Sequence, residues 1–595
     1  MINLLKEKHI TNANVYVNGQ KTEFVSLSLE QSLGEHHTFS VTLDYDKLKK
    51  SFLSNPKEQM ELIGKPLDID LQQGADSGNA YEFRGIICDI IHEGQEGKHG
   101  FLIIQGMSPT ILLERGKRLD IFSNIDLKTV FQEVTAGAGN GLSCVNQPVY
   151  TGQLDFLMQY QESDWEFLKR LSAITGETLL YTGRDLVFGE HKEFKEIEVT
   201  YDKEITRFQF GAKLIPNHFS HYQYLPEKDE ALKQDAPASV ENSNEYIDTA
   251  SEGAMEVTQK RPVYTPLAIS VQDQGSLEEI VKREKTSNAS QTVYVKGTAK
   301  TCVARIGRLL TINMPTDMIG AKPLGTYRVV KVKHTIDQNN RYESEFEAVP
   351  ASLKFLPVPE IKLPVAESIL AKVIKNNDPK GLGRVVVEFP FAQDRVSNTW
   401  LRVMSPDAGS SGDVPQNRGL VFIPEVGDQV MVGFEFGDPN QPYVMGSMFH
   451  GKNGTGGGGS NATKSIFTRS GTQIVFNDGQ KSIHISDPSG NTWDMDGNGT
   501  ISVNAPSCFK VNSGGSSLTM NASGEITISA STSVEIKVGE ATTLSMKTSS
   551  IDVTSSQNTV TGTNTITGGD TTINQGNVTI EGKVVTIKGT PVNIN

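Results

Sequence analysis

Few residues in this chain have the spacing of a chemical site, and the strongest example is an aspartate-rich turn near the C-terminus. The segment "DMDGNG", Asp494 to Gly499, reproduces the start of a calcium-binding loop. The twelfth position of such a loop carries a bidentate glutamate, whereas here it is Ala505. Tight turns also favour Asp, Asn and Gly, because these residues tolerate positive φ. With strand-like residues on both sides, we predict a β-hairpin here rather than an ion site.

Two other groupings of polar side chains have simpler explanations than catalysis or metal binding. In "HFSH", His218 and His221 lie three residues apart in a strand-like segment with no third metal ligand nearby. Asp164 and Glu166 stand at the start of a helix, where the helix dipole and an N-terminal cap account for both. No G-x-S-x-G, H-E-x-x-H or P-loop pattern occurs. We therefore expect no catalytic residue, no metal ligand and no cofactor.

Basic residues are too evenly mixed with acidic ones to form a nucleic-acid surface. The chain has 56 Lys and Arg against 70 Asp and Glu, a net charge of −14, whereas nucleic-acid binding needs a basic face. In the segment 366–450, arginines are interleaved with carboxylates, at Arg384, Arg395, Arg402 and Arg418 and at Glu388, Asp394, Asp407 and Asp413. We expect no nucleic-acid partner.

Length and composition place the chain among multidomain proteins rich in β-structure. Its 595 residues correspond to about three to five domains. The cysteines are far apart, as in a protein with reduced thiols, at Cys88, Cys144, Cys302 and Cys508. The start, "MINLLKEKHI", has no signal-peptide pattern, and no stretch reaches the roughly 18 apolar residues of a membrane span. We expect synthesis in the cytoplasm, with any export by another route.

Two amphipathic helices are expected within a long region of strands. Partial alternation predicts strands up to about residue 110 and again to about residue 350. Between them, "NIDLKTVFQEVTAG" predicts a helix capped by Asp126, with Gly137 beyond its end. In "QYQESDWEFLKRLSAITGETLLY", Ser163 and Glu166 form a capping box and Gly176 follows the helix. The apolar stripe of this second helix is Phe167, Leu168, Leu171 and Ile174.

Breaks in composition divide the rest of the chain. A polar stretch at about 225–260 is expected to form an exposed insertion. Three prolines in "FLPVPEIKLPV" predict a stiff linker, and the short strands of 366–450 suggest a small barrel or sandwich. A glycine run, "GKNGTGGGGSNAT", then leads to a tail of Ser, Thr, Asn and Gly without helix patterns.

The tail cannot bury a core as a single chain. Isoleucines recur there every seven residues, three of them followed by glycine two positions later, at Ile566, Ile573, Ile580 and Ile587 and at Gly568, Gly582 and Gly589. An odd period excludes one long strand, because each repeat would switch faces. One or two buried apolar residues per repeat, at about 1.5–3 kcal/mol each, fall short of a backbone ordering cost of about 1–2 kcal/mol per residue. We therefore predict short strands with glycine turns in an intertwined trimeric β-prism.

Several motifs resemble the VgrG (valine–glycine repeat) spike proteins of type VI secretion systems, which are similar to the hub and spike proteins of contractile phage tails. "QYQESDWEFLKRL" resembles the family's hub signature, and "EFRGII" and "SPTILLERGKRLDIFSNIDLKTVFQEV" resemble the segment before it. "GRVVVEFPF", "WLRV" and "FIPEVGDQVMVGFEFGDPNQPYVMGSM" match the family's OB-fold neck in order and spacing. The resemblance spans the whole chain, and its GDPNQP turn is a specific signal.

The resemblance implies a mainly β protein with a minor α+β part. A hub of β-barrels is expected at 1–355, with a helical part at about 108–180. A Pro-rich linker at 356–365 precedes the OB-fold neck at 366–450. A Gly-rich linker at 451–463 then leads to a triple-stranded β-helix needle at 464–595. Two differences from the family are that the neck carries "MSPDAGSSGDVPQNRG" where a tryptophan-containing stretch is common, and that neither a toxin domain nor a lysozyme domain is present.

The resemblance also implies a non-enzymatic homotrimer that punctures membranes. Its hub would sit on a hexameric tube of Hcp type among baseplate components, and effectors or adaptors would travel with it. A tip protein of PAAR type would dock on Val592, Asn593, Ile594 and Asn595. The spike would be assembled in the bacterial cytoplasm and injected by the contractile apparatus, contacting the target membrane transiently.

Other functions remain as alternatives to a type VI spike. The sequence also fits the spike of a phage-like or extracellular contractile particle. A trimeric tailspike enzyme that degrades polysaccharide would need paired carboxylates on the needle, where those present are scattered. A fibrous adhesin would need a surface anchor or a signal peptide.

Overall fold

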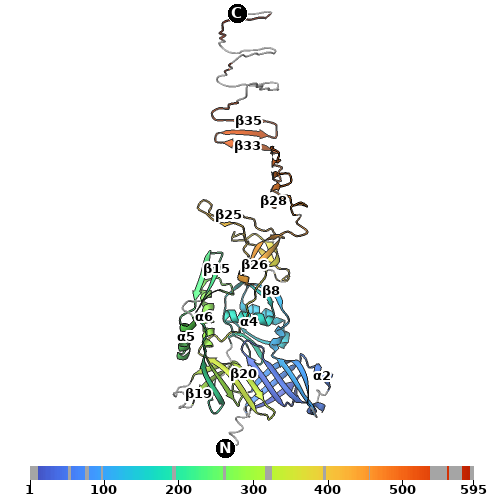
Figure 1. The fold of residues 1–595 in the computed structure, drawn as a ribbon, viewed down its shortest axis with the longest axis vertical. Helices are drawn as coiled ribbons and strands as arrows, with labels where there is room; N and C mark the ends of the chain where they lie inside the picture. Colours follow the sequence, from blue (N-terminus) through green and yellow to red (C-terminus); the bar gives the residue numbers. More distant parts are fainter. Residues whose placement is uncertain are drawn as a thin grey trace. The chain divides into compact units, whose positions relative to one another are not determined.

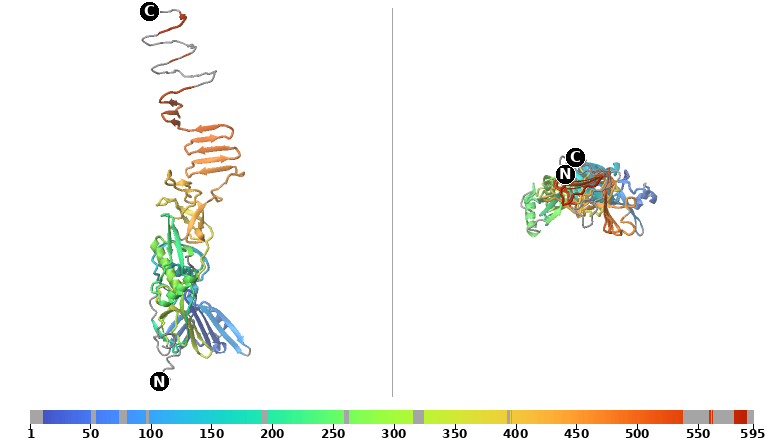
Figure 2. Two further views of the ribbon diagram at one scale, coloured as in Figure 1. Left: turned by 60° about the vertical axis from the view of Figure 1, so that its left-hand side comes forward. Right: turned by 90° about the horizontal axis from the view of Figure 1, so that it is seen from above.

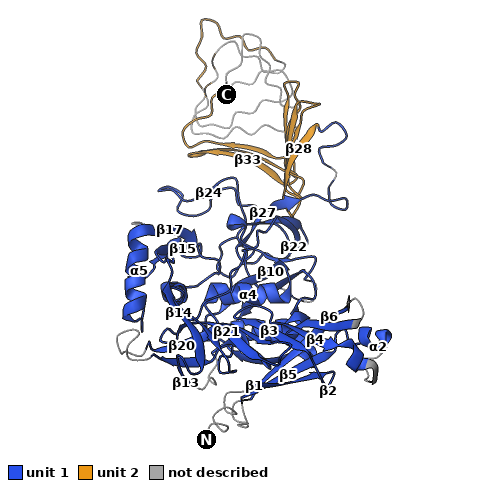
Figure 3. Ribbon diagram, turned by 60° about the horizontal axis from the view of Figure 1, so that its bottom comes forward, with its two compact units in different colours: residues 1–461 blue, residues 462–595 orange. Residues whose placement is uncertain are grey.

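The structure is a computed structural model of the chain, and it divides into two compact units, residues 1–461 and 462–595 (Figure 3). It describes residues 11–50, 55–73, 80–95, 98–190, 196–258, 263–314, 324–392, 395, 397–454, 456–536, 559, 561 and 579–589. Strands predominate in both units, so the prediction of a mainly β protein is confirmed. No helix within these ranges is both long enough and apolar enough to cross a membrane.

The first unit is built around one large sheet of thirteen strands (Figure 1). Its first half comes from the strands β1 (Thr11–Val17), β2 (Gln20–Thr22), β3 (Ser26–Ser32), β4 (Thr38–Asp44), β5 (Pro66–Gln73), β6 (Tyr81–Gln95) and β7 (Lys98–Met107). Its second half comes from β13 (Ile197–Thr200), β14 (Ile205–Ala212), β18 (Val293–Ala299), β19 (Leu309–Asn313), β20 (Thr326–Ile336) and β21 (Tyr342–Pro350). The halves join where β3 pairs antiparallel with β20. Alternate residues of β3 and β4 are buried, which gives the sheet its core face.

Along the chain, the helical part that the sequence predicted comes between the two halves of the sheet. Helix α3 (Leu127–Ala136) is capped by Asp126, whose carboxylate accepts from the amide of Thr129 at 2.7 Å. Helix α4 (Asp164–Thr175) begins with the predicted capping box and ends at Gly176, which has φ 70°. The strands of this part are β8 (Arg118–Ile125), β9 (Ser143–Gln147), β10 (Leu154–Glu162), β11 (Leu179–Tyr181) and β12 (Asp185–Gly189). Short helices stand at Tyr45–Lys50, Pro56–Met60, Pro109–Leu113 and Gly139–Gly141.

The expectation that strands resume to about residue 350, with an exposed insertion at about 225–260, missed two further helices in this region. These are α5 (Glu245–Thr258) and α6 (Gln274–Ser290), beside a small sheet of β15 (Phe219–Leu225), β16 (Glu230–Asp235) and β17 (Val263–Pro266). The polar stretch at 225–260 is also not fully exposed, since Leu232 and Ile247 are buried. Helix α6 escaped prediction because its buried side includes Arg283 and Lys285, which a binary apolar pattern does not register.

A small barrel follows in the same unit. Its sheet has the order β23 (Val386–Glu388), β22 (Ile369–Lys375), β26 (Gln429–Phe434) and β27 (Pro442–Met448). A short helix at Glu435–Gly437 links β26 to the turn before β27. Two short strands, β24 (Ala408–Gly409) and β25 (Arg418–Gly419), pair with each other outside that sheet.

The second unit consists of short antiparallel strands in two sheets, of which the larger is seen in Figure 2 as an orange stack. The larger sheet holds β28 (Thr463–Phe467), β29 (Gln473–Asn477), β30 (Ser482–Ser486), β31 (Thr492–Met495) and β32 (Ile501–Asn504). The smaller holds β33 (Cys508–Ser513), β34 (Ser516–Asn521) and β35 (Ile526–Ser529). The turn between β31 and β32 contains "DMDGNG", where the amides of Asn498 and Thr500 donate to Asp496. The predicted hairpin is therefore confirmed.

Candidate functional site

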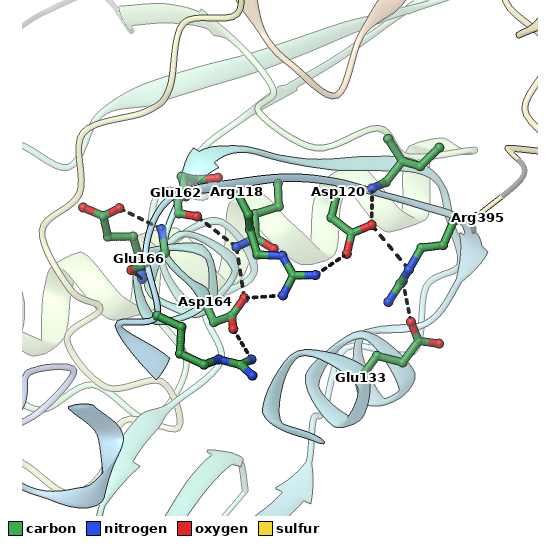
Figure 4. Close-up of polar contacts among 11 residues, drawn as sticks. Arg118, Asp120, Glu133, Glu162, Asp164, Glu166 and Arg395 are labelled. Atoms are coloured by element: carbon green, nitrogen blue, oxygen red, sulfur yellow. Dashed lines mark hydrogen bonds and ion pairs between the residues drawn. The ribbon is translucent and has the colours of Figure 1, made fainter. Parts of the chain in front are cut away.

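Helix α4 starts in a buried ionic network (Figure 4). Asp164, the first helical residue, is 2% exposed and pairs with Arg115 and with Arg118, whose nearer nitrogen lies 3.5 Å away. The side chain of Gln159 donates to the same carboxylate at 3.2 Å. A helix start favours negative charge, and two guanidinium groups neutralise it here. Asp164 thus has ion-pair partners beyond the helix dipole, while Glu166 closes the capping box.

Nearly two turns further along α4, Arg170 forms a buried ion pair with Glu162. Both guanidinium contacts to the Glu162 carboxylate measure 2.8 Å, and Arg170 also donates to the carbonyl oxygen of Met158 at 2.6 Å. The guanidinium carbon lies 5.1 Å from the Phe167 ring centroid. Such a bidentate pair fixes direction as well as distance. It therefore holds the end of β10 against α4.

Arg395 of the small barrel reaches this network from the other side. Its guanidinium lies 3.3 Å from Asp120 on β8 and 2.6 Å from Glu133 on α3, as Figure 4 shows. It also stacks 4.6 Å from the ring centroid of Phe122. Asp120 is held in turn by Arg118 at 3.1 Å. One barrel arginine is thus tied to the same ionic network as the start of α4.

The "GDPNQP" turn, residues 437–442, forms hydrogen bonds with main-chain groups of β10 and of residues 267–268. The side chain of Asn440 accepts from the amide of Met158 at 3.0 Å and donates to the carbonyl of Ala268 at 3.0 Å. Gln441 donates to the carbonyl of Leu267 at 3.2 Å. Burial raises the pKa of Asp438 to about 6. This turn satisfies buried backbone groups that would otherwise lack partners.

A second salt-bridge cluster forms where the β15–β16 hairpin meets the barrel. Glu227 in the hairpin turn binds Lys380 at 2.5 Å and also Arg384. Arg384 binds Asp378 at 2.8 Å and holds the pKa of that carboxyl far below its usual range. The hydrogen bond from Lys380, with that from Arg384, lowers the pKa of Glu227. These shifts show that the charges stabilise one another.

An apolar core lies between these polar contacts. Side chains from β8 and β10 pack in one cluster with the interior of the barrel, and the members include Ile121, Phe156 and Met158 with Val373, Phe389 and Val432. The rings of Phe156 and Phe389 lie 6.4 Å apart. We call this whole contact region the joint: the core, the Arg395 contacts, the 437–442 turn and the Glu227 cluster. The joint connects the barrel to the helical part and to the region of the β15–β16 hairpin.

The other residues that the sequence singled out are dispersed. Glu284 binds His221 at 2.7 Å; burial lowers the pKa of this histidine, but the Glu284 contact outweighs burial and the net shift is upward. Arg402 pairs with Glu435 and Arg418 with Asp407, each within the barrel region. Within the described ranges no group of three or more His, Cys, Asp and Glu is placed to hold a metal ion. Val592 to Asn595 lie outside the described residues.

Sequence reasoning missed every contact that spans the joint. The partners of Arg395 and Asn440 lie more than 170 residues away along the chain, so no local pattern reveals them. The available signals were indirect. The capping box marked α4 as well ordered, and the compact GDPNQP turn marked residues 437–442 as a special loop.

Two known protein families match the segments of the chain that meet at the joint. Residues 32–340 match the model of the phage tail baseplate hub (GPD) family. Residues 369–449 match the type VI secretion system/phage-baseplate injector OB domain. The first match covers most of the large sheet and the helical part, and the second covers the barrel.

Individual proteins agree with these matches. The type VI secretion system spike proteins VgrG1c and VgrG1a of Pseudomonas aeruginosa are each 25% identical to this chain, over 71% and 67% of its length. The chain spans 61% and 64% of the length of these two relatives. Among solved structures, the half-lidded PdpA–VgrG complex of Francisella aligns over 84% of this chain and 90% of that chain, with a TM-score of 0.52 at 10% identity. This likeness supports the fold.

Proposed function

Because the chain belongs to the phage tail baseplate hub family and carries an injector OB domain, we propose that it is the spike of a type VI secretion apparatus. In this role three copies form a rod that is driven through a membrane. The work is mechanical, and no residue performs chemistry. The observation that carries the proposal is the uncovered apolar surface of the second unit.

Apolar side chains prevail on one face of the larger sheet, although Lys464 ends one of the rows there and Phe467 and Val475 lie on the opposite face. Cross-strand partners place two apolar rows on one face of the larger sheet, namely Ile466, Ile474, Ile485, Trp493 and Val503, and Phe476, Ile483, Met495 and Ile501. The opposite face carries Ser465, Val475, His484, Asp494 and Ser502. The smaller sheet repeats the arrangement with Phe509, Met520 and Ile526. A one-sided apolar sheet must be covered to be stable in water.

Within the part of the chain that the structure describes, no segment covers this face. None of the described residues of the second unit is buried, and Ile501 and Ile580 are 60% and 67% exposed. Ordering the backbone costs about 1–2 kcal/mol per residue, and one chain recovers too little of this by burial. Three copies around one axis would bury all these faces against each other with closed symmetry. Toward the C-terminus, Ile580 and Ile587 lie seven residues apart. They are further apolar side chains that other copies would have to cover.

The joint gives this rod a mechanical base. In our proposal the large-sheet hub rests on a hexameric tube of Hcp type among baseplate components, and the OB neck passes axial load from the hub to the needle. A PAAR-type tip protein would dock on Val592 to Asn595, and effectors or adaptors would be carried with it. The chain would be made in the bacterial cytoplasm and leave by injection. The matching OB-domain family includes injectors of phage baseplates as well as of type VI systems. A phage-like or extracellular contractile particle is therefore the second candidate.

Sedimentation of the purified chain tests the oligomer directly. The expected mass is three times 65.0 kDa. A stable, folded monomer would contradict the proposal. Purification of assembled particles, with their proteins identified by mass, would separate a type VI apparatus from a phage-like particle.

A further inference from the structure

A long arm leaves the small barrel and returns to it without touching its core. We define the arm as residues 405–422. At its start the amide of Met404 donates to the carbonyl of Val444 in β27 at 2.8 Å, and after its end Ile423 packs against the barrel core again. Every residue from 406 to 422 is exposed. Figures 1 and 3 show β24 and β25, which lie in the arm, projecting away from the barrel.

The contacts within the arm are too few to explain its shape. Strands β24 and β25 are two residues each, supported by the amide of Leu420 donating to Asp407 at 2.9 Å and by the Arg418–Asp407 ion pair at 2.9 Å. A lone two-stranded hairpin is marginal in water. The arm nevertheless presents Leu420, Val421 and Phe422 to solvent, the last of them 59% exposed. Such a segment gains stability when another surface covers it.

The barrel carries an apolar surface of matching character, which we call the methionine face. Its exposed members are Leu370, Met404, Phe436, Met445 and Met448. A cleft of about 470 Å³ opens in this face, between the segments Arg402–Met404 and Phe434–Phe436 and beside Tyr443. Flexible methionine side chains suit a surface that adapts to an incoming chain.

The backbone at Phe436 strengthens the case for a docking surface. Phe436 has φ 55° and ψ 15°, a left-handed conformation, which costs a non-glycine residue about 1–2 kcal/mol. Its ring is nevertheless 72% exposed, so burial within the chain does not offset the strain. A strained residue that displays an aromatic ring beside an open cleft is typical of a binding site.

We propose that the arm of one copy packs on the methionine face of a neighbouring copy, with Leu420 and Phe422 entering the cleft beside Phe436. This inference rests on the proposed trimer and names the contact that closes it at the neck. β27 ends at Met448 and β28 begins at Thr463, so trimer formation by the tails would bring the necks together. Each limb of the arm extends roughly 25 Å, which is long enough to cross to an adjacent barrel. Three arms would close a ring in which each copy both gives and receives one.

A disulfide experiment on the full chain tests this contact. The variant Phe422→Cys/Met445→Cys is oxidised and run on a non-reducing gel beside each single variant. A matched control pairs Phe422→Cys with Val257→Cys, an exposed position on α5. We expect chain-to-chain dimers and trimers only for the Phe422/Met445 pair. Cross-links confined within single chains, or equal cross-linking in the control pair, would overturn the inference.

Trypsin cleavage after Arg418 gives a second readout that does not depend on cysteine. The covered arm should resist cleavage, and Leu420→Ser/Phe422→Ser should accelerate it at least tenfold while the circular dichroism stays unchanged. An equal cleavage rate in the wild type and this variant contradicts the arm contact. The sedimentation mass separates the two ideas. A wild-type monomer defeats the proposed function, whereas a trimer without arm cross-links and without arm protection defeats only this inference.

Discussion

The enclosed pair of Glu162 and Arg170 offers the sharpest test of how β10, which carries one side of the joint, is held against α4. The substitution Glu162→Gln keeps the size of the side chain and removes its charge. Arg170 is 2% exposed and would keep the carbonyl of Met158 as a full partner, so its cation would be left largely unneutralised. Removing one member of a buried ion pair costs about 3–5 kcal/mol. The double variant Glu162→Gln/Arg170→Met removes the buried charge as well and should recover most of that loss.

Hydrogen–deuterium exchange of the α4 and β10 amides measures the effect locally, where a multidomain chain has no single unfolding transition. At a factor of ten per about 1.4 kcal/mol, Glu162→Gln should speed their exchange at least about a hundredfold. The control is Glu82→Gln, which breaks the half-exposed Glu82–Arg184 pair and should cost less than about 1 kcal/mol. If the two single variants exchange alike, or if the double variant is no better than Glu162→Gln, the buried pair does not hold β10 against α4.

Four further perturbations follow from the same structure. Burial lowers the pKa of both His37 and His334 to about 3, so the unfolded chain takes up protons first as the pH falls below 6.5. The thermal transition in which the large sheet unfolds should therefore shift to lower temperature between pH 6.5 and pH 4, because the sheet loses up to about 1.4 kcal/mol of stability per pH unit for each histidine. Variants with Gln at both positions should lose that pH dependence. Because the pKa of Asp438 is raised to about 6, its contribution is lost as the pH rises through 6, so Asp438→Asn should raise the unfolding midpoint at pH 8 and have little effect near pH 4; a lower midpoint at pH 8 contradicts this. Asn440→Ala leaves the Met158 amide and the Ala268 carbonyl without their partner and should cost about 1–3 kcal/mol, visible as faster exchange at Met158 but not in β1. Trp493→Ser, on the apolar face of the second unit, should weaken the trimer in sedimentation, whereas Asp494→Ser on the opposite face should not.

Local interactions explain which parts of the fold the sequence could predict. The capping box of Ser163 and Glu166 and the left-handed Gly176 act within a few residues, so the bounds of α4 could be read directly. The hairpin at Asp494 to Gly499 is local in the same way. Helix α6 could not be predicted from the sequence. Its buried Arg283 forms an ion pair with Glu177, which lies about a hundred residues earlier in the chain. A pattern of apolar residues carries no information about such pairing.

The joint was beyond prediction for a related reason. Arg395, Arg384 and Asn440 look like ordinary surface residues in the sequence, since their contacts across the joint form only when distant segments meet. The resemblance in the "GDPNQP" segment indicated an important turn without indicating what it contacts. Only the folded chain shows that residues 437–442 bind main-chain groups of β10 and of residues 267–268.

That choice of partners has an evolutionary consequence. Asn440 and Gln441 bind the amide of Met158 and the carbonyls of Leu267 and Ala268, and every amino acid but proline supplies both groups. Residues 158, 267 and 268 can therefore diverge without losing these bonds, so long as the backbone keeps its course and no proline enters at 158. Exchange of the barrel between proteins of different sequence would therefore leave these bonds intact, whereas the Arg395, Glu227 and apolar-core contacts of the joint require matching side chains on both sides.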